Sequence, residues 1–312
     1  MDQFQNDPYT INIVEALRIA ESIKATYVRK VSADEYRNFV DRFEVYLKTK
    51  QMENMKLSEF TKRHAVRYLD DILLSRKVNA LTRNNYMRVM RALFYVLVER
   101  EYVKANPFAN IKRLKETQKR RRTFGDREKK TIIQYIKHEN KQLLLAICLC
   151  YYCGMRPSEM RRLRIRDIDL KLGLIFLDGS QTKNKDLGTI TIPKVLLPLL
   201  ETYQFHNFPK GWYVFGAGTL KPGAQQCGRD TISKKHKRVV DDLHECRFLS
   251  DVEGKTFYSW KDTAAKDLIA LGLNVMDLKA HFRHKELTTT QRYMQTYGGV
   301  NDNIRDVANK IF

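Results

Sequence analysis

Two segments of the sequence carry side chains that could do chemistry, and these side chains are cationic and phenolic. In the first segment, residues 154–159, Arg156 stands directly before Pro157. Proline is favoured in the first turn of a helix, so this pattern predicts that Arg156 lies at a helix N-terminus. A buried guanidinium is costly unless it meets an anion, which makes Arg156 a candidate anion-binding residue. The alternative is an ion pair between Arg156 and Glu159.

The second segment, residues 280–293, lies near the C-terminus and contains His284 and Tyr293. A phenol is a possible nucleophile if it loses its proton as it attacks, and histidine is suited to proton exchange near neutral pH. In the alternative interpretation, Tyr293 is a packing residue and His284 caps a helix. Tyr297 is a second candidate nucleophile.

Other common kinds of active site are missing from the sequence. It has no P-loop pattern, no Rossmann glycine pattern, no HExxH zinc motif and no GxSxG nucleophile elbow. Its histidines and carboxylates are not grouped at ligand spacing, so a metal-dependent nuclease has no clear candidate site. Cys150 and Cys153 have CxxC spacing but no second pair, and the five cysteines do not suggest a disulfide framework. We therefore expect no metal and no cofactor.

The composition points to a polyanionic partner. The chain has 312 residues, with 57 Lys and Arg against 36 Asp and Glu, and its formal net charge is +21. The basic excess occurs in both halves of the chain, and nucleic acid is the commonest polyanionic partner. A generally basic surface is the alternative. No apolar stretch is long enough to span a membrane and no signal peptide is recognisable, so we expect a cytoplasmic protein without a membrane partner.

The spacing of apolar residues predicts the elements that must position these side chains. In residues 11–115 they recur every three or four positions, with breaks near 53–55, 77–79 and 106–107, which predicts a bundle of four or five helices. We expect this helical domain to cover residues 1–115. Residues 116–125 lack apolar periodicity and predict a linker, which is basic at Lys119, Arg120, Arg121 and Arg122. These four residues and Arg283 are candidate DNA contacts, although a charge run can also be merely solvated.

The second domain, residues 126–312, is predicted to be mainly helical with a small β-sheet. Residues 123–126 resemble a capping box that opens its first helix, and a second helix at 141–153 is apolar nearly all round, as expected of a core helix. Alternating residues predict strands at 174–177 and 189–193, joined by a turn-rich segment. Further helices are expected at 195–203, 229–244, 260–271 and 275–282.

Together these motifs resemble the tyrosine recombinases of the phage-integrase and Xer type. The matching features are Arg156 in Cys-Gly-Met-Arg-Pro-Ser-Glu-Met, Lys183 before the second strand, and His284 followed by Tyr293 in His-x-x-Leu-x-Thr-Thr-x-x-Tyr. The resemblance covers nearly the whole chain from about Tyr27. It implies a helical, SAM-like core-binding domain followed by a mixed α/β catalytic domain.

The sequence departs from that family at one motif. Where the family has His-x-x-Arg, this chain has Tyr258 and Lys261. Tyr-x-x-Lys occurs in a branch of integrases carried by bacterial mobile elements, so the departure does not require an inactive protein. Lysine keeps the positive charge but lacks the bidentate fork of arginine, which weakens geometric control over a bound phosphate.

The resemblance also implies a mechanism that needs neither metal nor ATP. Arg156 and Lys261 would bind the scissile phosphate, Tyr293 would attack it to form a covalent 3′-phosphotyrosine, and His284 would assist. Lys183 would protonate the leaving oxygen, with Lys185 as the alternative. The role of Tyr258 would be a hydrogen bond to the phosphate or support of Lys261.

The partners implied by the resemblance are double-stranded DNA and three further copies of the chain, which form a homo-tetramer on paired DNA sites during integration or excision of a mobile element. Accessory DNA-bending proteins are possible further partners, and the bound protein would be associated with the nucleoid. Many family members have an additional N-terminal arm-binding domain, so this chain is expected to be a two-domain recombinase or a fragment of a longer one. Two alternatives stay open: a type IB topoisomerase-like enzyme and a DNA-binding protein whose active site has decayed.

Overall fold

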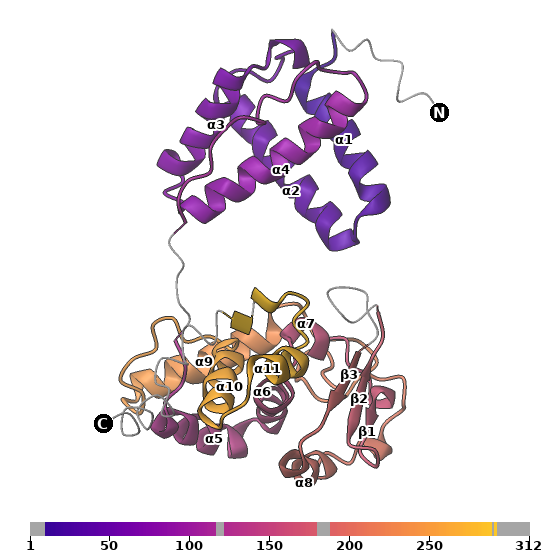
Figure 1. Cartoon of the computed structure of the whole chain (residues 1–312), viewed down its shortest axis with the longest axis vertical. Coiled ribbons are helices and arrows are strands. Elements are labelled where there is room, and N and C mark those ends of the chain that lie inside the picture. The colour runs from indigo at the N-terminus through magenta and orange to yellow at the C-terminus, as the bar shows by residue number, and fades with distance from the viewer. Residues whose placement is uncertain (1–9, 117–121, 180–187, 289, 292–312) are drawn as a thin grey trace, which may run out of the picture. The chain divides into compact units, whose positions relative to one another are not determined.

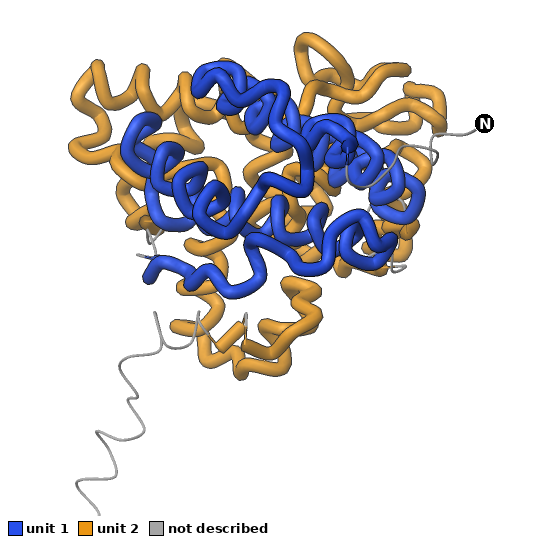
Figure 2. Tube along the Cα trace, turned by 90° about the horizontal axis from the view of Figure 1, so that it is seen from above, with its two compact units in different colours: residues 1–118 blue, residues 119–312 orange. Residues whose placement is uncertain are grey.

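The computed structural model describes residues 10–116, 122–179, 188–288, 290 and 291. The chain divides into two compact units, residues 1–118 and 119–312, which Figure 2 colours blue and orange. In the described part of the chain, no helix is long and apolar enough to cross a membrane.

Unit 1 is built from four α-helices in its described residues (Figure 1). They are α1 (Ile13–Tyr27), α2 (Lys30–Thr49), α3 (Lys62–Ser75) and α4 (Ala80–Glu99). Helix α4 packs against the other three and buries most of its apolar side chains. This confirms the predicted helical character of the region, but the last helix ends at Glu99 and not near the proline at 107.

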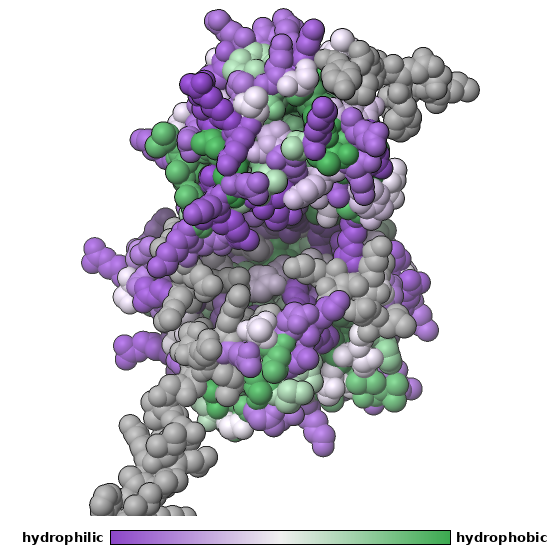
Figure 3. Space-filling model, turned by 45° about the horizontal axis from the view of Figure 1, so that its top comes forward, coloured by the Kyte–Doolittle hydropathy of each residue, from purple (hydrophilic) through white to green (hydrophobic). Residues whose placement is uncertain are grey.

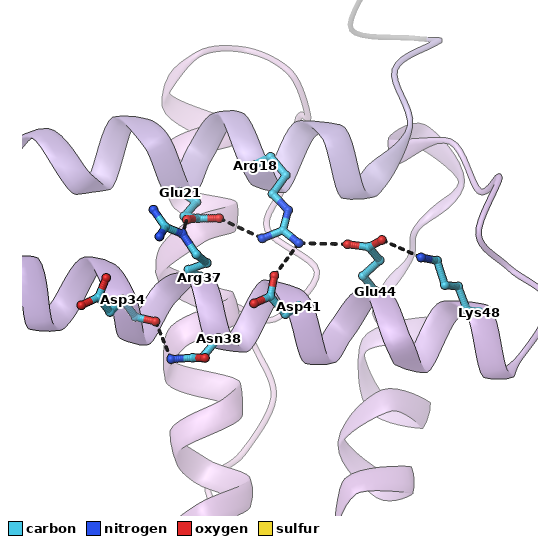
Figure 4. A network of polar contacts seen from close by, with 8 residues as sticks. All are labelled: Arg18, Glu21, Asp34, Arg37, Asn38, Asp41, Glu44 and Lys48. Atoms are coloured by element: carbon cyan, nitrogen blue, oxygen red, sulfur yellow. Dashed lines mark hydrogen bonds and ion pairs between the residues drawn. The ribbon is translucent and has the colours of Figure 1, made fainter.

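A network of charged side chains joins α1 to α2 (Figure 4). Arg18 of α1 donates to Glu21 of its own helix and to Asp41 and Glu44 of α2. Arg37 of α2 reaches back to Glu21, which is buried. Exposed ion pairs contribute only about 0 to 1 kcal/mol each, but a buried carboxylate needs its partners. The network therefore fixes the pairing of the two helices, and its opposite charges largely cancel.

The chain after α4 is held along that helix by side chains of α4. Arg83 is buried and donates to the carbonyl of Lys112, while the amide of Asn84 donates to the carbonyl of Leu114. Arg91 donates to two more carbonyls in the same segment. The path of the chain toward residue 116 is therefore determined by α4.

Unit 2 combines α-helices with a small sheet. The helices are α5 (Asp126–Glu139), α6 (Lys141–Cys153), α7 (Pro157–Met160), α8 (Leu197–Glu201), α9 (Thr231–Glu245), α10 (Ser259–Ala270) and α11 (Val275–Phe282). The strands β1 (Ile168–Asp169), β2 (Leu174–Leu177) and β3 (Gly188–Thr191) form an antiparallel sheet in that order (Figure 1). The predicted fold class, mainly helical with a small sheet, is confirmed.

Helix α6 is the centre of unit 2, as its apolar sequence predicted. It packs against α5, α9 and α10, and its side chains are buried on nearly every face. Its cysteines, Cys148, Cys150 and Cys153, are free thiols, and burial raises the pKa of each to about 12. They are neutral packing residues in this helix.

Several predicted boundaries in unit 2 were wrong. Helix α5 is capped by Glu128, whose carboxylate accepts from the N–H of the N-cap residue Gly125 at 2.9 Å, and not by a capping box at residues 123–126. The helix predicted at 195–203 is a 3₁₀ turn followed by the short α8. Strand β3 is Gly188–Thr191, where 189–193 was predicted. Strand β1 was not predicted, because two residues are too few to give a periodic pattern.

The surface reflects a chain in which 30% of residues are charged. Among the coloured residues on the face drawn in Figure 3, hydrophilic side chains predominate and hydrophobic side chains form separate patches between them.

Candidate active site

The candidate site lies where α6 ends and α7, α10 and α11 come close to it. Gly154 ends α6 with a φ of +58°, in the left-handed region. A Cβ at this position would lie 2.7 Å from Cδ1 of Phe282 in α11, closer than atoms can pack. Glycine is therefore required both for the turn and for the contact between α6 and α11.

Arg156 follows as the N-cap residue of α7, the position that the sequence predicted. Its Nη1 donates to Oε1 of Glu159 at 2.7 Å, and its backbone N–H donates to Oε2 at 2.8 Å. The ion pair with Glu159 that was left open from the sequence is thus present. Burial of Glu159 opposes its ionisation, but Arg283 and Arg156 outweigh this effect and hold the pKa of its carboxyl below the usual value.

Lys261 lies in the first turn of α10 and is only 2% exposed. Its Nζ donates to the carbonyl of Gly154 at 2.6 Å and lies 4.9 Å from the ring centre of Phe282. Burial, followed by repulsion from Arg156 and Arg283, lowers the pKa of the Lys261 amine to about 7. Its charge therefore depends on pH near neutrality.

His284 follows α11 by two residues and is 9% exposed. Its Nδ1 is hydrogen-bonded to Oγ1 of Thr290 at 2.9 Å. Burial, and then the charges of Lys261, Arg156 and Arg283, lower its pKa to about 4. At neutral pH the ring is uncharged, with one nitrogen as donor and the other as acceptor.

Arg283 lies inside the same cluster. Its side chain is 17% exposed, and its Nη2 donates to Oε2 of Glu159 at 2.9 Å and to the carbonyl of Gly154 at 3.2 Å. The sequence suggested only a DNA contact at this position. One feature of the sequence could have indicated a role inside the protein. Arg283 directly follows the predicted helix 275–282, at a position where glycine is common.

Of the other predicted site residues, Tyr258 is described by the structure and five are not. Tyr258 is half-buried at the start of α10, and its carbonyl accepts from the N–H of Lys261 at 3.0 Å. The remaining predicted residues lie outside the described residues: Lys183, Tyr293, Lys119, Arg120 and Arg121.

Strand β3 begins beside the cluster. A Cβ on Gly188, its first residue, would lie 4.0 Å from Cδ of Arg283. Gly188 is therefore next to the site that holds Arg156 and Lys261. Among the described residues, no three His, Cys, Asp or Glu side chains gather as ligands for a metal ion.

Arg122, within the predicted linker, contacts the loop before α10. Its guanidinium forms an ion pair with Asp251, and its backbone N–H donates to the carbonyl of Gly254 at 3.3 Å. The side chain is half exposed. This contact anchors the start of unit 2 near the first turn of α10.

The chain is similar in sequence to known recombinases. XerC, a tyrosine recombinase of Staphylococcus epidermidis, is 22% identical over 265 residues, which are 83% of this chain and 82% of XerC. IntQ of Escherichia coli K12, which is described as a defective protein, is 28% identical over 204 residues, and this match spans 62% of the chain but only about half, 49%, of IntQ.

Solved structures share the fold. The Tn1549 transposon integrase in complex with a circular intermediate DNA superposes with a TM-score of 0.75 at 15% identity, over 96% of this chain and all of the other. The lambda integrase tetramer bound to a Holliday junction gives 0.71 at 16% identity, over 92% of this chain and 81% of the other. The model of the phage integrase family matches residues 122–298, more than half of the sequence. The chain therefore belongs to the phage integrase family and is a tyrosine recombinase, an enzyme that cleaves and rejoins DNA at specific sites.

Proposed function

We propose that this recombinase is the integrase of a mobile DNA element and that it acts through a covalent 3′-phosphotyrosine intermediate on Tyr293. The observation that carries the proposal is the convergence of Arg156, Lys261 and His284 at the end of α6. The similarity to a transposon integrase over nearly the whole chain supports the role in a mobile element.

The cations of the site would bind the scissile phosphate. Attack on a phosphodiester places additional negative charge on its non-bridging oxygens, and fixed positive charges stabilise that transition state. Arg156 would hold two oxygens through its planar fork, while Lys261 would act as a point charge. Because Lys261 is buried, its field is less screened than that of a surface lysine.

The proton transfers would be divided among three residues. Tyr293 loses its phenolic proton as its oxygen bonds to phosphorus, and the neutral ring of His284 can take part because one of its nitrogens is an acceptor. The bond from phosphorus to the 5′-oxygen breaks, and Lys183, or Lys185, protonates the leaving oxygen. The new phosphotyrosine ester conserves the bond energy, so a 5′-hydroxyl of another strand can reverse the step without ATP.

Strand exchange would require a homo-tetramer on two duplexes. The lambda integrase, which shares the fold, forms a tetramer on a Holliday junction, and this supports the same assembly here. Lys119, Arg120 and Arg121 would contact the DNA backbone. Accessory DNA-bending proteins would bring distant sites together.

A trapped covalent adduct tests the proposal. The substrate is a duplex selected by the protein from a randomised pool and nicked next to the cleavage point, so that the released fragment diffuses away. We expect an adduct on Tyr293 in the wild type, no adduct in Tyr293→Phe, and an adduct in the matched control Tyr297→Phe. An adduct that persists in Tyr293→Phe overturns the assignment of the nucleophile.

Two other results would replace the proposed function. Tight DNA binding by a wild type that never forms an adduct would identify a decayed, DNA-binding protein. Rapid relaxation of a supercoiled plasmid with a single site, at low protein concentration and without recombinants, would identify a type IB topoisomerase-like enzyme.

A further inference from the structure

Arg283 occupies a backbone position that arginine does not favour. Its φ is +53°, in the left-handed region where glycine is preferred. The side chain turns inward, and its two terminal nitrogens donate to four acceptors: the carbonyls of Cys153, His281 and Gly154, and the carboxylate of Glu159. A guanidinium used in this way is directed at the protein and is poorly placed to grip a DNA backbone.

The carboxylate of Glu159 links Arg283 to Arg156. Glu159 is 1% exposed, and its Oε2 accepts from both Nη2 of Arg283 and the backbone N–H of Arg156. Its Oε1 accepts from the side chain of Arg156. A buried carboxylate that holds two guanidiniums fixes one relative to the other, because neither can move without leaving a buried charge incompletely paired.

The carbonyl of Gly154 links Arg283 to Lys261. It accepts from Nη2 of Arg283 at 3.2 Å and from Nζ of Lys261 at 2.6 Å. Nη2 of Arg283 therefore donates both to the carboxylate of Glu159, which also binds Arg156, and to the carbonyl of Gly154, which also binds Lys261. In this way one nitrogen atom joins the two cations that the proposed function assigns to the phosphate.

We propose that Arg283 is a positioning residue of this recombinase, which sets Arg156 and Lys261 at the spacing that the scissile phosphate requires by bridging Glu159 and Gly154. The inference rests on the proposed function. It assigns Arg283 a role in the chemical step and not in holding the DNA. Lysine at position 261 makes this support necessary, because a flexible ammonium has no planar fork that would orient it.

The test compares Arg283→Gly with Arg247→Gly. Arg247 is exposed, also has a left-handed φ, of +62°, and lies outside the site. Glycine suits both backbones, so the pair isolates the side chain. Single-turnover cleavage of the nicked duplex gives the rate constant and the final fraction of adduct, and titration with the same duplex gives the Kd.

For Arg283→Gly we expect the rate constant at saturating DNA to fall about 100-fold, as displaced catalytic groups do, with the final adduct fraction unchanged and the Kd within about 3-fold of the wild type. Arg247→Gly should leave all three quantities unchanged. Arg283→Lys, which keeps the charge but not the fork, should be nearly as slow as Arg283→Gly and takes its place if the glycine variant does not fold.

Other outcomes would overturn the inference. An unchanged rate constant with a weaker Kd would make Arg283 a DNA contact, and a lower adduct fraction at an unchanged rate constant would make it a folding residue. Additive losses in Arg283→Gly and Glu159→Gln would mean that Arg283 does not act through Glu159. A wild type that forms no adduct would overturn the proposed function, and this inference with it.

Discussion

At the scale of single residues, the amine of Lys261 is a group of the site whose charge changes near neutral pH. Two cations, Arg156 and Arg283, and the carboxylate of Glu159 surround it, together with the thiol of Cys150. Burial and the two arginines lower the pKa of Lys261 to about 7. Because the protonated amine is the form that attracts a phosphate, this useful form is lost as the pH rises through about 7.

Replacement by arginine should remove this dependence on pH. At DNA concentrations below saturation, the cleavage rate reports the groups of the free protein. We expect the ratio of the wild-type rate to that of Lys261→Arg to fall about tenfold per pH unit above pH 7, because arginine stays charged. The other titrating groups are the same in both proteins, so their effects cancel in the ratio of the two rates. Quenched-flow cleavage between pH 6 and 9 measures both rates.

The matched loss variant is Lys261→Ala, which should be inactive throughout that pH range. A ratio that stays constant from pH 6 to 9 would show that Lys261 is charged at every pH in the free protein, or that it does not act on the phosphate.

The sequence allowed part of this site to be predicted. Arg156 was predicted because Pro157 marks a helix N-terminus, whereas Lys261 and His284 followed from the resemblance to the tyrosine recombinases. The bridging position of Arg283 was not predictable, because it depends on contacts with Gly154 and Glu159, which lie about 130 residues away in the chain.

At the scale of elements, the site depends on the close approach of α6 and α11. The two helices end at the same place, and Gly154 of one meets Phe282 of the other. Lys261 of α10 also lies against that phenylalanine ring. A small change in the spacing of α6 and α11 would therefore move the carbonyl of Gly154, which accepts hydrogen bonds from Lys261 and Arg283.

Gly154→Ala should destabilise unit 2 by roughly 2 to 4 kcal/mol, since it combines a left-handed φ with a clash against Phe282. Gly218→Ala is the matched control, because its φ is +76° but nothing lies within 4 Å of the added Cβ. The control should lose only about 1 to 2 kcal/mol. Urea unfolding of each variant measures the difference, and equal losses would mean that α11 moves aside without cost.

The elements themselves were predicted where the sequence pattern is long. The bounds of α6 and α11 agree with the sequence, because a helix of several turns shows its apolar side repeatedly and ends at recognisable residues. The short β1 and α8 did not follow from periodicity, because elements of two and five residues are too short to show a repeating pattern.

At the scale of the whole molecule, the basic side chains behind the net charge of +21 fall into two groups, buried and exposed. A few cations are buried around Glu159, where their charge acts at short range. Many others are exposed, and only these can release counterions from a long DNA backbone. In unit 1, the network of Arg18, Glu21 and Asp41 contributes little net charge, so DNA binding should rely on other basic side chains.

The linker offers a test of that division. Replacing Lys119, Arg120 and Arg121 together by alanine should weaken the dependence of DNA binding on salt. The slope of the logarithm of the DNA-binding constant against the logarithm of the salt concentration should fall in magnitude by up to about 3, because each lost phosphate contact contributes about 0.9. Arg122→Ala should change the slope by less than about 1, because this side chain is paired with Asp251. Fluorescence anisotropy with a random-sequence duplex at several salt concentrations measures both. Equal slopes for the triple variant and the wild type would remove the linker from the DNA contacts.

The charge balance around Glu159 also affects how the purified protein will behave. Arg156 and Arg283 share the carboxylate of Glu159, and a protonated Lys261 adds a third positive charge beside them. Without DNA, this surplus repels itself inside a poorly solvated space, and small inorganic oxyanions can relieve it. Sulfate or phosphate in a buffer should therefore act as a weak competitor of the substrate and, at the same time, as a stabiliser during storage.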